Sequence, residues 1–177
     1  MKKHRKFTFL LPVLLLLTVL LSSCSAGGAP SSGSEDPSLP EGSDVLPAVS
    51  LDDFSEAASA YGTVTDMTEQ LTFETASVQT DRINIIYMKT HTEKQAENLI
   101  SGGTDSEDTV TVLRSGQNYS YCEENAPEDP SDGTAAFYGY YLRVDNVLLL
   151  VTGSPEDRTF VRETAEEFFT SLGYSGN

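Results

Sequence analysis

The stretch AAFYGYYLRVDNVLLLVTG, residues 135–153, carries the clearest structural signal in this sequence. Two runs rich in aromatic, β-branched and leucine residues flank Asp145 and Asn146, and aromatic and β-branched residues favour strands. Asp and Asn both tolerate the positive φ angles that a two-residue hairpin turn requires. The stretch therefore predicts a β-hairpin whose turn is formed by these two residues.

A turn at this position also predicts which side chains share a face, because strand side chains alternate between the two sides of a sheet. One face is expected to hold three apolar cross-strand pairs: Val144 with Val147, Leu142 with Leu149, and Tyr140 with Val151. The opposite face is expected to carry five further large side chains: Phe137, Tyr141, Arg143, Leu148 and Leu150. The first face is the predicted core face, and the second is unusually apolar for a solvated surface.

Two interpretations of the second face follow. In the first, another part of the same domain covers it, either the N-terminal helix or residues 63–80, since a single domain usually hides its own apolar surface. In the second, its five large side chains form a binding surface, because aromatic residues and arginine are typical of interface anchors. This second interpretation makes Phe137, Tyr141, Arg143, Leu148 and Leu150 the candidate ligand-binding residues.

Helix signals lie on both sides of the hairpin. Three segments carry an N-cap residue followed by an apolar stripe at helical spacing, and they begin at Ser50 with Asp53, Thr92 with Gln95, and Ser154 with Pro155 and Asp157. Further strands are predicted over 82–90, 109–115 and 118–123, whereas 63–81 is ambiguous between strand and irregular chain.

The order of these elements predicts an α+β fold with one mostly antiparallel sheet and helices packed on one face. This is a two-layer sandwich, for which a ferredoxin-like arrangement is one alternative. The globular domain is expected to span residues 50–175, an ordinary size for one domain.

The first residues form a separate pattern: a basic start, MKKHRK, an apolar run, and small residues before Cys24. The apolar run is about 15 residues long, short of the roughly 20 that span a bilayer, so a removed signal peptide over 1–23 is favoured. Leu21-Ser22-Ser23-Cys24 resembles the lipobox of bacterial lipoproteins. That resemblance implies cleavage before Cys24 and lipidation of its thiol, whereas an ordinary secretory signal is the alternative.

Residues 24–49 are expected to form a disordered tether, because Gly, Ser, Pro and acidic residues dominate them and large apolar groups are few. A diacylglyceryl group on Cys24 would supply two acyl chains, which hold a membrane where a single chain does so only marginally. The predicted location is therefore the extracytoplasmic face of a cell membrane, with membrane lipid bound through Cys24.

The charge balance excludes one class of partner. Four of the 11 basic residues precede Cys24, which leaves seven against 27 acidic residues and a net charge of −20. Such a surface disfavours nucleic acid, whose phosphates attract lysine and arginine. The excess of acid indicates solubility and repulsion from like-charged surfaces.

Catalytic patterns are absent from the sequence. It contains no HExxH motif, no Cys-x-x-Cys pair, no G-x-S-x-G elbow and no phosphate loop. If Cys24 carries lipid, Cys122 has no partner for a disulfide, and a lone cysteine is most often a small buried hydrophobic residue. No catalytic residue, metal ligand or cofactor is therefore assigned, and an enzyme is not expected.

Two acid-rich segments, TDSEDT at 104–109 and EENAPEDPSDG at 123–133, leave calcium binding open as an alternative. Neither segment matches the EF-hand spacing, and solvated loops are the simpler interpretation.

The hairpin YYLRVDNVLLLV, followed by a helix ending in LGY, is similar to the globular parts of small lipoproteins from Gram-positive bacteria. This likeness implies no activity. The expected function is that of a membrane-anchored, non-enzymatic binding or accessory module with a protein partner at the cell envelope. A lipoprotein that binds a small solute or Ca²⁺ is the alternative.

Overall fold

A computed structural model describes residues 45–101, 109–128 and 135–174 of the chain. The predicted signal peptide, Cys24, most of the tether, residues 104–108 of the first acid-rich segment and residues 129–133 of the second lie outside these residues. The elements follow in this order: α2 Leu51–Ala58, β1 Val64–Asp66, β2 Glu74–Gln79, β3 Ile83–Lys89, α3 Glu93–Ser101, β4 Val110–Ser115, β5 Tyr119–Ala126, β6 Phe137–Val144, β7 Val147–Gly153, the 3₁₀ turn η1 Pro155–Asp157, and α4 Arg158–Ser171.

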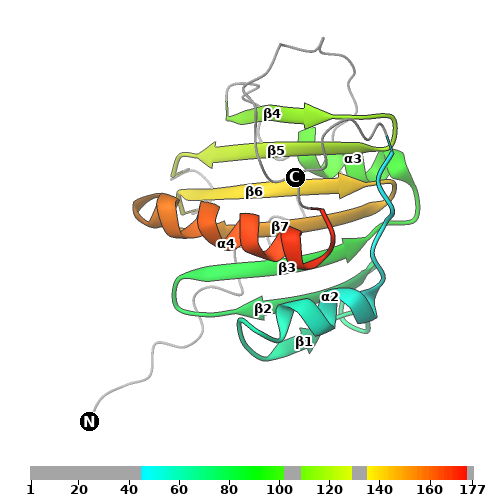
Figure 1. The fold of residues 1–177 in the computed structure, drawn as a ribbon, viewed down its shortest axis with the longest axis horizontal. Coiled ribbons are helices and arrows are strands. Elements are labelled where there is room, and N and C mark those ends of the chain that lie inside the picture. Colours follow the sequence, from blue (N-terminus) through cyan, green and yellow to red (C-terminus); the bar gives the residue numbers. More distant parts are fainter. Residues whose placement is uncertain (1–44, 102–108, 129–134, 175–177) are drawn as a thin grey trace.

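All seven described strands form one antiparallel sheet, in the order β1-β2-β3-β7-β6-β5-β4 (Figure 1). Each half of the sheet is a meander of consecutive strands, and the two halves join where β3 pairs with β7. The predicted α+β class, a single antiparallel sheet with helices packed against it, is confirmed. The ferredoxin-like alternative does not apply, because that motif follows a βαββαβ order and here three strands precede α3 and four follow it.

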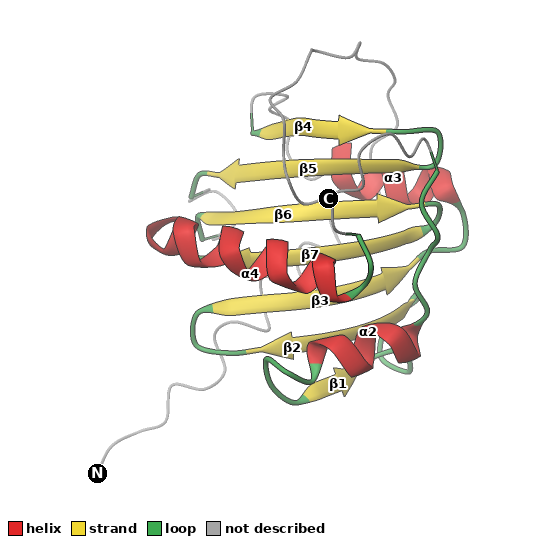
Figure 2. Cartoon of the chain, viewed as in Figure 1, coloured by secondary structure: helices red, strands yellow, loops and turns green. Residues whose placement is uncertain are grey.

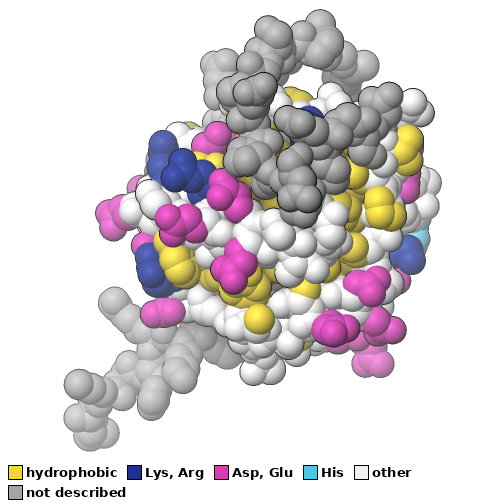
Figure 3. Space-filling view, in the orientation of Figure 1, with side chains coloured by type: hydrophobic (Ala, Val, Ile, Leu, Met, Phe, Trp, Pro, Cys, Tyr) yellow, Lys and Arg dark blue, Asp and Glu magenta, His cyan; other side chains and the backbone are white. Residues whose placement is uncertain are grey.

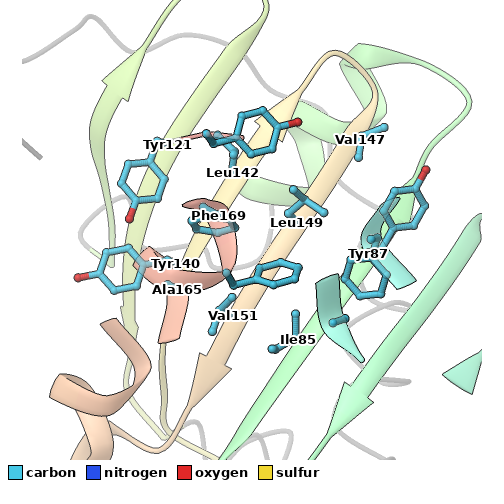
Figure 4. Close-up of a cluster of buried hydrophobic side chains, with 14 of the residues drawn as sticks. Ile85, Tyr87, Tyr121, Tyr140, Leu142, Val147, Leu149, Val151, Ala165 and Phe169 are labelled. Carbon is cyan, nitrogen blue, oxygen red and sulfur yellow. The ribbon is translucent and has the colours of Figure 1, made fainter. Parts of the chain in front are cut away.

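The hairpin formed by β6 and β7 has the predicted register. Val144 pairs with Val147, and Asp145 adopts a φ of 52°, in the left-handed region that the turn requires. Its core-facing side chains meet α4, and ten labelled members of that cluster appear in Figure 4: Ile85, Tyr87, Tyr121, Tyr140, Leu142, Val147, Leu149, Val151, Ala165 and Phe169.

Helices α2 and α4 lie side by side over this core face (Figure 2). The predicted capping box of α2 is confirmed, since Ser50 Oγ accepts from Asp53 N at 3.2 Å and Ser50 N donates to Asp53 Oδ2 at 3.1 Å. These two helices bury aromatic rings against the sheet, among them Phe54 and Phe168, whose centroids are 5.8 Å apart.

The start of α4 differs from the prediction. Ser154 Oγ accepts from Glu156 N at 3.3 Å, and η1 precedes the α-helix. Asp157, expected to complete a capping box with Ser154, instead pairs with Arg82 at 2.5 Å. The reason is that Arg82, at the turn before β3, offers this carboxylate a charged donor.

The ambiguous stretch before β3 forms two strands, β1 and β2, which extend the sheet. The last residues of the expected tether, 45–49, are also described, and Leu46 among them is only 3% exposed. Its backbone is held by Asn118, whose Oδ1 accepts from Leu46 N at 2.9 Å and whose Nδ2 donates to Leu46 O at 2.8 Å. Tyr174, beyond the end of α4, donates its hydroxyl to Pro47 O at 2.7 Å. The packed part of the chain therefore includes Leu46, ahead of Ser50.

Candidate functional site

The five candidate binding residues lie on one face of the sheet, as predicted. Within the hairpin, Arg143 pairs with Leu148 and Tyr141 with Leu150, one position out of step with the core pairs. Phe137, the first residue of β6, lies on the same face four residues before Tyr141. We call the side of the sheet opposite α2 and α4 the second face.

The second face is largely covered. Leu148 is 2% exposed, Arg143 4% and Tyr141 7%, whereas Phe137 and Leu150 are half-buried. Three of the five predicted residues are thus interior side chains, and these three form no open binding surface in this structure.

The element that covers part of the second face is α3, which contacts β6 and β7. The expectation that α2 would do so is wrong, because α2 packs against β2 and β3 on the core face. The segment 63–80, the other expected cover, contributes Phe73 at the margin. Ala96 of α3 is fully buried against Met88 and Leu148, and these three residues form a cluster separate from the main core.

Capping residues fix where α3 begins. Thr92 N donates to Gln95 Oε1 at 3.2 Å, and Gln95 N donates to Thr92 Oγ1 at 3.2 Å, which is the predicted capping box. Thr90, two residues before Thr92, lies between β3 and α3. It is 2% exposed and donates its N–H to Asn146 O at 2.9 Å. The turn of the hairpin therefore positions the first turn of α3.

Arg143 connects α3 to the sheet. Its Nη1 donates to Glu93 Oε1 at 2.7 Å, and its Nη2 lies 3.7 Å from Glu97 Oε1. Nη1 also reaches the carbonyl oxygens of Asn118 at 3.4 Å and Asp145 at 3.3 Å, in the two neighbouring turns. Nε of Arg143 is buried and has no hydrogen-bond partner among the described residues. The guanidinium group thus joins two turns and one helix.

The carboxylates of this ion pair were not identified from the sequence. Glu93 and Glu97 stand four residues apart in EKQAE, so they lie on one face of a helix. Their side chains are 49% and 53% exposed, while that of Arg143 is 5% exposed. The spacing of the two glutamates indicates that they share a helix face. Nothing in the local sequence indicates that they pair with an arginine fifty positions later.

A second cluster of polar side chains on this face comprises Cys122, Glu124 and Tyr141. The thiol is 1% exposed, and burial raises its pKa to about 12, with Arg143 lowering it and Glu124 raising it to smaller extents. Burial likewise raises the pKa of Glu124, partly offset by a hydrogen bond from the Tyr141 hydroxyl. Burial and the neighbouring Glu124 raise the pKa of Tyr141 well above its ordinary value.

These environments define what the group can do chemically. A thiol with a pKa near 12 is protonated at neutral pH and is a poor nucleophile, because the thiolate is the reactive form. The prediction that Cys122 is a buried free cysteine is confirmed. His91 is exposed, and its ring contacts that of Phe73 at a centroid distance of 5.6 Å, away from Cys122's strand.

The described part of the acid-rich segment 123–133 is mostly built into the sheet. Glu123 accepts a hydrogen bond from the Tyr138 hydroxyl at 2.5 Å, and Glu124 is 6% exposed. Within the described ranges, no group of three or more His, Cys, Asp or Glu side chains is arranged to hold a metal ion. Nor does any helix of those ranges have the length and hydropathy to cross a bilayer.

The chain matches no family model, no curated protein and no solved structure.

Proposed function

We propose that this chain is a membrane-anchored extracytoplasmic lipoprotein whose domain serves as a non-enzymatic binding or accessory module. The observation that carries the proposal is the order of residues at its start: basic residues, an apolar run, then Leu21-Ser22-Ser23-Cys24. Cys24 is the residue to which lipid is attached, and a protein at the cell envelope is the partner.

The position of Leu46 supports a tethered arrangement. About 21 residues separate Cys24 from Leu46, and a flexible chain of that length has an end-to-end distance of roughly 25 Å. Leu46 is buried and bonded to Asn118, so the point of attachment on the domain is fixed. A domain held in this way samples a thin layer above the membrane.

The character of the second face supports a binding role over a catalytic one. Two of its titratable groups are unsuited to catalysis: Arg143 is paired with Glu93, and burial keeps the Cys122 thiol protonated at neutral pH. The acidic surface, spread over the face that carries α2 and α4 in Figure 3, favours solubility and a partner that is not nucleic acid.

Lipidation is tested by expressing the full chain in bacteria fed with an alkyne-labelled fatty acid. We expect label on the wild-type chain and none on Cys24→Ala, and we expect an inhibitor of lipoprotein signal peptidase to leave the signal peptide uncleaved. Cys122→Ala is the matched control and should be labelled as strongly as the wild type. Label that survives Cys24→Ala, or an unlabelled wild-type chain, would show that Cys24 is not the anchor.

The solute- and calcium-binding alternative is distinguished by a thermal-shift panel of Ca²⁺, amino acids, sugars and nucleotides on the chain from Val45 onward. A ligand that binds only the folded state raises the melting midpoint, and the rise grows with the logarithm of its concentration above Kd. A module that works through protein contacts predicts a cooperative melt and no such rise. A rise in the melting midpoint with one class of ligand would replace the proposed protein partner by a ligand of that class.

A further inference from the structure

Helix α3 is attached to the domain differently from α2 and α4. The main core joins both of those helices to five of the strands, whereas α3 rests on a separate cluster whose buried members are Met88, Ala96 and Leu148. Of the α3 side chains whose burial is described, only Ala96 is fully buried, while Leu99 and Ile100 are half-buried. In Figure 1, α3 lies behind the sheet, apart from the other two helices.

We propose that α3 is a latch: a helix that opens separately from the rest of the fold, and that a carboxylate-bearing helix of the protein partner displaces from the second face. This inference rests on the proposed binding function and names its surface. The surface is the part of the second face beneath α3, which comprises Met88, Arg143 and Leu148.

The length and contacts of α3 support separate opening. A nine-residue helix is too short to be stable in water by itself, so tertiary contacts must hold it. Regions with few buried apolar contacts open at lower free energy than the global core. The chain before α3 is firmly held, since Thr90 bonds to Asn146 of the hairpin turn, so an opening of α3 begins after Thr90.

Arg143 determines the chemistry of the partner. When α3 leaves, a guanidinium group that was 5% exposed loses the carboxylates of Glu93 and Glu97, while its Nε already has no partner. In the open state water solvates this group, but a segment that takes the place of α3 buries it again, and leaving a buried charge uncompensated is strongly unfavourable. A segment that replaces α3 must therefore bring carboxylates of its own, one helical turn apart, beside a small apolar residue that fits where Ala96 sat.

The apolar part of the surface sets the second requirement. Leu148 and Met88 are buried by α3 in the closed state, and half-buried Leu150 and Phe73 border them. An amphipathic helix supplies side chains at the matching spacing of three and four residues. The partner segment is thus an amphipathic helix with acidic residues on the edge of its apolar stripe, which is the pattern that α3 itself presents.

Separate opening is tested by native-state hydrogen exchange. We expect amides of residues 95–101 to exchange by an opening that leaves the amides of β7 protected. Replacing Glu93 and Glu97 together by Gln should speed exchange in α3 by about tenfold or more, because the buried guanidinium then lacks charged partners. The matched control is Glu163→Gln with Glu167→Gln, an exposed pair at the same spacing on α4, which should leave α3 unchanged.

Displacement is tested with a synthetic peptide of residues 90–101, THTEKQAENLIS, added to the Glu93→Gln, Glu97→Gln protein. Binding should shift the methyl NMR signals of Met88 and Leu148, and a peptide with both glutamates changed to glutamine should bind at least about tenfold more weakly, since it brings no charge to Arg143. Exchange of α3 only through global unfolding would overturn the latch. Unshifted methyl signals, or equal binding of both peptides, would overturn displacement by a carboxylate-bearing helix.

These outcomes are separate from those for the anchor. Loss of the latch would leave the labelling of Cys24 unaffected. Conversely, an unlabelled Cys24 would remove the membrane from the proposed function while the hydrogen-exchange result on α3 stood.

Discussion

Single residues on the second face are held in strongly non-aqueous surroundings. Glu124 is the clearest example, because it is a carboxyl group only 6% exposed on β5, with the Tyr141 hydroxyl as its hydrogen-bond donor. Burial raises its pKa above the ordinary value of 4.5. The folded chain therefore holds this proton more tightly than the unfolded chain does, and the contribution of Glu124 to the free energy of unfolding falls as pH rises above that value.

The corresponding prediction concerns Glu124→Gln. The amide removes the charge but keeps an oxygen that accepts from Tyr141, so we expect the variant to have a higher free energy of unfolding than the wild type at pH 7. The gain should shrink as pH falls toward 4, where the wild-type carboxyl is neutral too. Urea denaturation at both pH values measures it, with Glu128→Gln, an exposed neighbour, as the control. A gain of equal size at both pH values would contradict the assigned cause.

At the scale of elements, close backbone approach sets how α4 sits on the sheet. Gly153 ends β7 at the point where η1 leads into α4. A Cβ atom there would lie 2.6 Å from Arg82 O and 2.7 Å from Val161 Cγ2. The first contact is to backbone of β3's turn and the second to a buried side chain of α4, so neither can move without shifting an element.

We therefore expect Gly153→Ala to lower the free energy of unfolding by about 1–3 kcal/mol, the usual cost of overpacking. The reason is that the added methyl group pushes α4 away from β7 or bends the turn before β3. Chemical denaturation measures the loss. Thr159→Ala, on the exposed side of the start of α4, is the control and should change stability by less than about 0.5 kcal/mol. Wild-type stability in Gly153→Ala would mean that α4 packs less closely than described.

Elements with a strict pattern were predictable from the sequence, and elements without one were not. The hairpin register followed from two residues that accept a positive φ and from alternation on both sides. Strands β1 and β2 gave no such signal, because Thr, Ser, Glu and Gln alternate there with few large apolar residues. Their place is set by pairing with β3, a contact that one segment read alone does not contain.

The same limit applies to the candidate site. Alternation placed Tyr141, Arg143 and Leu148 on one face correctly, since this is a local property of β6 and β7. Alternation did not indicate which element covers these residues. The residues that contact them belong to α3, and the ion pair between Glu93 and Arg143 spans 50 positions. An apolar face predicts that something covers it, but long-range packing decides which element does.

At the scale of the whole molecule, the chain before α2 belongs to the folded unit. We expect a chain that begins at Ser50 to have a free energy of unfolding about 2–4 kcal/mol lower than one that begins at Val45, since it lacks the buried Leu46 side chain and the hydrogen bonds around it. Thermal and urea denaturation of the two chains measure the difference.

Two variants of the longer chain separate the causes. Leu46→Ala keeps the backbone hydrogen bonds to Asn118. Its free energy of unfolding should fall only by the contribution of the buried leucine side chain. Ala48→Ser, at an exposed position, should behave as the wild type. Equal stability of the chains beginning at Val45 and Ser50 would show that Leu46 contributes nothing to the fold.

The contacts of Leu46 and Pro47 also have a mechanical meaning. Among the contacts that a pulling force applied from the N-terminal side meets first are three hydrogen bonds, two between Leu46 and Asn118 and one from Tyr174 to Pro47. None of the three belongs to the ladders of the sheet, so the load reaches a turn and the end of the C-terminal helix first. Under tension we expect these bonds to break before any strand separates. Residues 45–49 would then extend reversibly while the sheet stays intact.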